Sequence, residues 1–177
     1  MPCDRSASRC LGLALALSFG APVTRLVAQS CNAPCSLTVN AASLTPTDVL
    51  RLSLSSSSVS FTAPVEADYT AGFKAANGPT VTAKANRAFH VTVDAGSSTF
   101  GYSGALTNPG KPASDLQWAT ASGGPFSNNV GTAATLFSGS SGTAGTAQAI
   151  FFRTNLSYAV DRPGSYTLTV RYTLSAP

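Results

Sequence analysis

Residues 165–174 read SYTLTVRYTL, and this stretch carries the strongest fold signal in the chain. Its large apolar residues, from Tyr166 to Leu174, alternate with Thr and Arg. Successive side chains of a β-strand point to opposite faces, so we expect one face of this strand to be buried. The preceding residues 161–164 (DRPG) predict a turn, because Pro fixes φ and Gly accepts a left-handed conformation. We expect the strand to complete a sheet by lying between earlier strands.

Alternation continues upstream in residues 81–93 (VTAKANRAFHVTV), which predict a hairpin that turns at Asn86-Arg87. Residues 77–79 (NGP) predict a second turn, and residues 138–147 (SGSSGTAGTA) predict a loop. Shorter apolar runs predict further strands at residues 37–39, 49–54, 59–62, 69–75, 98–102, 115–119 and 149–153. Together these patterns predict an all-β, antiparallel β-sandwich with about eight or nine strands.

The composition agrees with an extracellular β-protein. Charged residues make up 10% of the 177 residues, well below the usual fraction of about a quarter. Apolar residues make up 44%, which is enough to fill one core. We therefore expect a single domain without long helices.

The N-terminal residues predict an export signal. Arg5 and Arg9 precede the apolar run at residues 11–19 (LGLALALSF), and small residues around Ala28 offer a cleavage site. The run is too short to span a bilayer. We expect residues 1–28 to be the signal peptide and residues 29–177 the mature domain, with Ala21 and Gln29 as rival ends of the signal.

Export would also change the charge. Removal of Arg5, Arg9, Arg25 and Asp4 lowers the net charge from +4 to +2. The remaining Lys and Arg residues are scattered along the chain, so the basic cluster expected of a nucleic-acid-binding protein is missing. We expect a secreted or cell-surface protein that binds no nucleic acid and does not span a membrane after cleavage.

Two cysteines remain after cleavage, Cys31 and Cys35. In an oxidising compartment their spacing predicts a small disulfide loop, worth about 2 kcal/mol by loop entropy. A zinc site would need two more Cys or His ligands, and the mature chain offers only His90. We expect a disulfide, no metal and no cofactor.

No sequence motif marks a catalytic site. His90 lies on the polar face of its predicted strand, and no G-x-S-x-G turn is present to pair with it. The carboxylates Glu66, Asp68, Asp94 and Asp115 are not arranged in a glycosidase or calcium-loop pattern. An internal Lys–Asn isopeptide crosslink is conceivable in a surface sandwich, but the sequence singles out no pair. We therefore expect no enzymatic activity.

Trp118 is the sole tryptophan, and its alternation with Leu116 predicts a core position. The alternative is an exposed ring that, with Tyr102 and Phe126, forms a stacking platform for a sugar. Sequence alone leaves both readings open.

The order of these features resembles exported bacterial β-sandwich proteins, including fimbrial-type subunits and spore-coat-U-like domains. Four segments carry the resemblance: residues 69–73 (YTAGF), 81–93, 111–118 (KPASDLQW) and 161–174. The resemblance implies an immunoglobulin-like or fimbrial-like sandwich. The chain departs from the fimbrial pattern at two points. The second-to-last residue is Ala176, whereas the fimbrial pattern has a Tyr at that position. In addition, no donor strand precedes Cys31. These departures favour a sandwich that carries its own last strand.

The expected function is that of a non-catalytic structural or adhesive protein at the cell surface, which binds copies of itself or other surface proteins. The alternative is a carbohydrate-binding module whose glycan contacts are Trp118, Tyr102 and Phe126.

Overall fold

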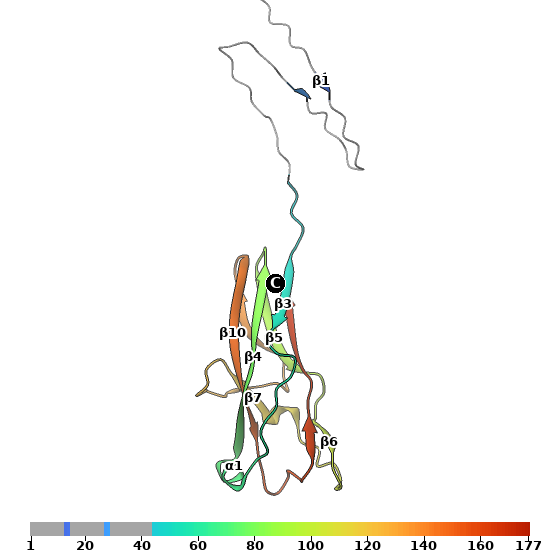
Figure 1. The fold of residues 1–177 in the computed structure, drawn as a ribbon, viewed down its shortest axis with the longest axis vertical. Coiled ribbons are helices and arrows are strands. Elements are labelled where there is room, and N and C mark those ends of the chain that lie inside the picture. The colour runs from blue at the N-terminus through green and yellow to red at the C-terminus, as the bar shows by residue number, and fades with distance from the viewer. Residues whose placement is uncertain (1–12, 15–26, 29–43) are drawn as a thin grey trace, which may run out of the picture. The chain divides into compact units, whose positions relative to one another are not determined.

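The computed structural model describes residues 13–14, 27–28 and 44–177. In the first part, β1 (Leu13–Ala14) pairs antiparallel with β2 (Val27–Ala28). The larger unit, residues 47–177, is built almost entirely of strands (Figure 1). Its elements are β3 (Leu50–Leu54), α1 (Glu66–Ala71), β4 (Phe73–Ala85), β5 (Phe89–Ala95), β6 (Gly101–Ser103), the single 3₁₀ turn η1 (Ala113–Asp115), β7 (Leu116–Ala119), β8 (Asn128–Asn129), β9 (Ala134–Gly139), β10 (Thr143–Asn155), β11 (Ser165–Thr167) and β12 (Val170–Ser175).

The strands of this unit form two principal sheets and a small ribbon, all antiparallel. The larger sheet has the order β3-β4-β10-β7-β8, and the smaller one has the order β12-β5-β9. Strand β11 pairs with β6 to form the ribbon. The predicted all-β antiparallel sandwich is therefore confirmed, with ten strands in the described residues of this unit.

The core lies between the two principal sheets. Alternate residues of β4 and β5 point into it, and Val81, Ala83, Val91 and Val93 are fully buried there. Ile150 and Phe152 of β10 and Trp118 of β7 join the same apolar cluster. Burial of each large apolar side chain contributes about 1.5–3 kcal/mol, so this cluster is the main source of stability.

The predicted hairpin at residues 81–93 is wrong, although its apolar alternation is correct. Strand β4 pairs with β3 and β10, whereas β5 pairs with β9 and β12. The residues around Asn86 therefore carry the chain from one sheet to the other. Both apolar faces then meet across the core, which a flat hairpin with one buried face would not allow.

Residues 69–75 are not a single strand. Residues 69–71 belong to α1, where Asp68 Oδ2 accepts a hydrogen bond from the Val65 N–H at 2.9 Å. Gly72 ends the helix with a φ of +78°, a conformation that glycine adopts without strain. The strand begins only at Phe73.

The predicted turn at residues 77–79 lies instead inside β4. Asn77 is opposite Phe151 and Thr80 is opposite Ala149, so Gly78 and Pro79 together face the single residue Ile150. This two-against-one arrangement is a β-bulge, which tolerates the missing N–H of proline.

Predicted strand boundaries differ elsewhere. Residues 59–62 form no strand, and the predicted loop at 138–147 is mostly strand, because β9 extends to Gly139 and β10 begins at Thr143. Strands β8 and β9 were not predicted. The strand expected at residues 37–39 lies outside the described residues.

The long final strand is broken into two. Leu168 and Thr169 separate β11, which belongs to the ribbon, from β12, which belongs to the smaller sheet. Strand β12 is the outer strand of that sheet, so the expectation that it lies between earlier strands is wrong. Its apolar side chains are only half-buried.

Candidate functional site

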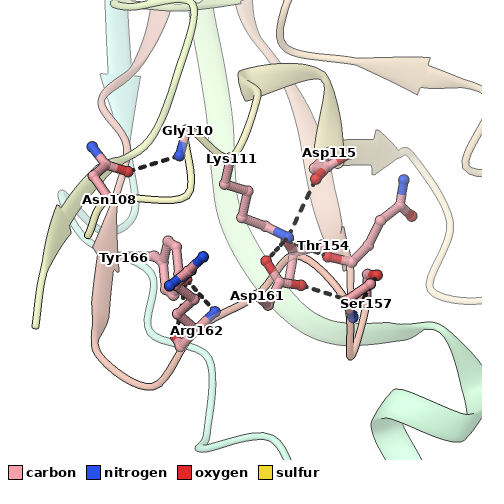
Figure 2. A network of polar contacts seen from close by, with 11 residues as sticks. Asn108, Gly110, Lys111, Asp115, Thr154, Ser157, Asp161, Arg162 and Tyr166 are labelled. Carbon is pink, nitrogen blue, oxygen red and sulfur yellow. Dashed lines mark hydrogen bonds and ion pairs between the residues drawn. The ribbon is translucent and has the colours of Figure 1, made fainter. Parts of the chain in front are cut away.

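A buried lysine forms the centre of a polar network between the loops that follow β6 and β10 (Figure 2). Lys111 is 4% exposed, and it is the only residue with a charged side chain that is buried as a whole in the described part of the chain. Its Nζ lies 2.8 Å from Asp161 Oδ1 and 3.3 Å from Asp115 Oδ2. It also donates to the carbonyl oxygen of Asn155 at 2.6 Å. The ammonium group therefore donates two hydrogen bonds and forms a second, longer ion pair with Asp115.

The Asp161 carboxylate is held from both sides. Its side chain is 4% exposed, and its Oδ2 accepts a hydrogen bond from the Ser157 N–H at 2.9 Å. The Asp161 N–H in turn donates to the Ser157 carbonyl at 2.9 Å, which closes a tight turn after β10. Both contacts fix the orientation of the carboxylate toward Lys111.

A tyrosine supports the next residue of this loop. Tyr166 Oη of β11 donates to the Arg162 carbonyl and accepts from the Arg162 N–H, at 2.9 and 2.8 Å (Figure 2). Its ring packs against Tyr102 of β6, with the ring centroids 5.1 Å apart. The loop is thus tied to the ribbon of β6 and β11.

An aromatic cavity of about 650 Å³ adjoins the network. Phe61, Phe100 and Tyr166 line it together with Lys111 and Asp161. The cavity is partly open to solvent, and its lining combines apolar rings with the buried ion pair.

Two stacked tyrosines also border this cavity. The rings of Tyr69 and Tyr158 are 4.8 Å apart with an interplanar angle of 26°. Desolvation raises the pKa of Tyr69, and the charge of Asp161 adds to this shift. Tyr158 is 67% exposed, so the pair presents a ring to solvent.

A second hollow lies between residues 54–61 and the final strands. It is a cleft of about 550 Å³, lined by Val59 and Phe61 on one side and by Leu168, Val170 and Tyr172 on the other. Burial raises the pKa of Tyr172 to about 12. Buried core residues, including Leu116 and Phe152, also line the cleft. The cleft is therefore an opening into the core at the edge of the sandwich.

The three proposed glycan contacts are not brought together. Trp118 is 3% exposed and lies in the core, as its alternation predicted. Phe126 lies against the guanidinium of Arg153 at 4.8 Å. Arg153 is adjacent to the core residue Phe152 on β10, so the two side chains point to opposite faces of the sheet. Tyr102 lies on the ribbon, where its Oη donates to the Pro163 carbonyl.

His90 and the half-buried carboxylates Asp68 and Asp94 have partners on neighbouring residues of the fold. His90 Nε2 lies 2.9 Å from Ser175 Oγ of the neighbouring strand. Ion pairs join Asp68 to Lys74 and Asp94 to Arg171. Within the described residues, no group of three His, Cys, Asp or Glu side chains is placed to hold a metal ion.

Sequence reasoning missed the Lys111 network. Residues 111–118 carry part of the family resemblance, and the spacing of Lys111 and Asp115 is typical of neighbours on one helical turn. No local pattern connects either residue to Asp161, which lies 50 residues beyond Lys111.

Two features bear on the export predictions. Cys31 and Cys35 lie outside the described residues, so their disulfide stays a prediction. Among the described residues, no helix has the length and apolar character needed to cross a membrane.

Comparison with known proteins gives no family assignment. No family model matches the chain, and no curated protein matches it.

Proposed function

We propose that this chain is a secreted or cell-surface structural or adhesive protein, which acts by binding rather than by catalysis. The observation that carries the proposal is the edge strand β12 beside the cleft lined by residues 54–61. Strand β12 has β5 on one side and no strand partner on the other among the described residues. Such an edge can accept an additional extended segment.

The backbone groups needed for this pairing are available. The Gly96 N–H donates to the Thr169 carbonyl, which makes these opposite residues a hydrogen-bonded pair. The antiparallel pattern alternates, so the N–H and C=O groups of Val170 and Tyr172 point away from β5. Both residues line the cleft, whose walls combine apolar side chains, such as Phe61, with several Ser and Thr residues.

The occupant we propose is an extended segment of a second copy. The sequence predicts a strand at Leu37 and Val39, which lie outside the described sheets. These residues are spaced by two, so both side chains would enter the cleft from one face of the strand. Self-association of this kind fits a structural role at a surface.

Light scattering on a sizing column, with negative-stain microscopy, tests the proposal on residues 29–177 purified after export. We expect oligomers or fibres from the unaltered chain and a monomer from the double variant Leu37→Asp, Val39→Asp. The matched control is Thr38→Asp, which adds charge on the opposite face and should still assemble. A monomer for the unaltered chain at every concentration would overturn the proposal.

The stacked pair Tyr69 and Tyr158 favours glycan binding as a second candidate function. An exposed aromatic ring beside a cavity is a suitable surface for a sugar. Under this candidate, Tyr158→Ala should abolish binding on an array of polysaccharides. The control Tyr102→Phe, which changes a ring away from the pair, should leave binding intact.

A further inference from the structure

The Lys111 network brings together the groups needed for amide formation between side chains. An amine and a carboxyl carbon must be held in contact, water must be kept out, and a third group must move protons. Lys111 and Asp161 side chains are 5% and 4% exposed, with Nζ and Oδ1 2.8 Å apart. Asp115, with Oδ2 at 3.3 Å from the same nitrogen, is the third group.

We propose that Lys111 and Asp161 form an intramolecular isopeptide bond, with Asp115 as the proton carrier. Transfer of one proton across the Lys111–Asp161 contact gives a neutral amine and a neutral carboxylic acid. The amine nitrogen then attacks Cγ of Asp161, and the N–C bond forms. Asp115 accepts a proton from the nitrogen and passes it to the Asp161 hydroxyl. The C–O bond breaks, one water molecule leaves, and Asp115 returns to a carboxylate.

The surroundings of Asp161 support this reaction. The Ser157 N–H, 2.9 Å from Oδ2, is placed to stabilise the negative charge that this oxygen acquires during the attack. Conversion of the ion pair into a neutral amide also removes two charges from a buried site. No oxidant, nucleotide or metal is required, because amine and acid yield amide and water. The event occurs once per molecule and is not enzymatic turnover.

The chain offers an internal comparison. Lys74 Nζ and Asp68 Oδ2 are also 2.8 Å apart, but their side chains are 19% and 20% exposed. Backbone N–H and ammonium donors hold Asp68 as they hold Asp161, but within the described residues no second acid forms an ion pair with Lys74. Proximity alone should therefore not crosslink this second pair.

Mass spectrometry of the exported full-length product, folded and then denatured and reduced, tests the proposal. Reduction removes any contribution from a disulfide. We expect the intact chain to be lighter by one water molecule than its processed sequence. Trypsin cuts after Arg153, between the two linked residues, so the peptides containing Lys111 and Asp161 should stay joined. The peptides on either side of Lys74 should separate.

Variants assign the roles. Lys111→Arg and Asp161→Ala should have the full unlinked mass, and Asp115→Asn should slow or abolish the loss of water. Circular dichroism of each variant establishes that it is folded. Full mass and separated tryptic peptides in the folded, unaltered protein would overturn the proposal without reference to any variant. An unchanged rate of linkage in Asp115→Asn would overturn the role of Asp115.

Discussion

The burial of the Lys111 ammonium group depends on the groups that surround it. Burial of an ammonium group is costly unless a carboxylate compensates it, and here two carboxylates and a carbonyl do so. The energetic consequence is asymmetric, because removal of one partner leaves the other buried and unpaired.

Replacement of Lys111 by methionine should therefore be strongly destabilising. We expect Lys111→Met to lower the free energy of unfolding by about 3–5 kcal/mol relative to Lys111→Arg, which keeps the charge but cannot form the proposed amide, measured by urea denaturation. The control Lys74→Met disrupts a more exposed ion pair, and its cost should stay below about 1 kcal/mol. Equal losses in both variants would contradict this account of Lys111.

Tyr172 predicts a dependence of stability on alkaline pH. Burial raises its pKa from 10.0 to about 12, so the folded state holds the phenol proton more tightly than the unfolded state does. The resulting stabilisation is complete below pH 10 and is lost as the pH rises from 10 to 12.

The variant Tyr172→Phe should consequently lose less stability than the unaltered protein over this range. Urea unfolding at neutral pH and at pH 12, combined with the absorbance of tyrosinate, measures the difference. Parallel pH profiles for the two proteins would show that Tyr172 makes no such contribution.

At the scale of single elements, the β-bulge in β4 leaves no room for a side chain at Gly78. A Cβ on Gly78 would lie 2.8 Å from Phe152 Cε2 and 2.9 Å from the Ile150 carbonyl oxygen. We expect Gly78→Ala to cost about 1–3 kcal/mol, because the buried Phe152 ring must move.

Gly145 of β10 is the matched control for this substitution. The nearest atom to a Cβ there is Lys84 Cε at 3.9 Å. Thermal unfolding of Gly145→Ala should give a midpoint equal to or above that of the unaltered chain. A larger loss in Gly145→Ala than in Gly78→Ala would contradict the described packing at the bulge.

Strands could be predicted where apolar and polar residues alternate over a long stretch. The sheet to which a strand belongs could not be predicted, because it depends on pairing with distant strands. The inward positions Val81, Val91 and Val93 follow from the period of two, and the structure buries all three. The sequence could not show that β4 and β5 lie in different sheets, because alternation specifies faces and not partners. The Gly-Pro pair in β4 predicted a turn. In the structure the strand continues through both residues, which form a β-bulge opposite Ile150 of β10.

At the scale of the whole molecule, the described core belongs entirely to residues 47–177. We expect a chain of residues 44–177 to unfold cooperatively with the same urea midpoint as the monomeric double variant Leu37→Asp, Val39→Asp of residues 29–177. It should also remain monomeric, since it lacks Leu37 and Val39. A clear drop in the midpoint would indicate that the preceding residues contribute to the stability of the sandwich.

The candidate site was less predictable than the fold, for a physical reason. The sequence identified Trp118 as a core residue or a sugar platform, and burial alone decided between them. The Lys111 network requires two loops to meet, and only the completed sandwich places them together. Residues that act through distant partners leave no local signature.

The proposed bond between Lys111 and Asp161 would also affect how the molecule responds to mechanical force. With these residues joined covalently, a force applied at the two ends would bypass the intervening segment, which contains β7 to β10. The segment between the linked side chains, whose residue numbers differ by 50, would then be unable to extend. At about 3.4 Å per residue, the fully stretched molecule would be shorter by about 170 Å. Such resistance to extension would suit the proposed structural or adhesive role.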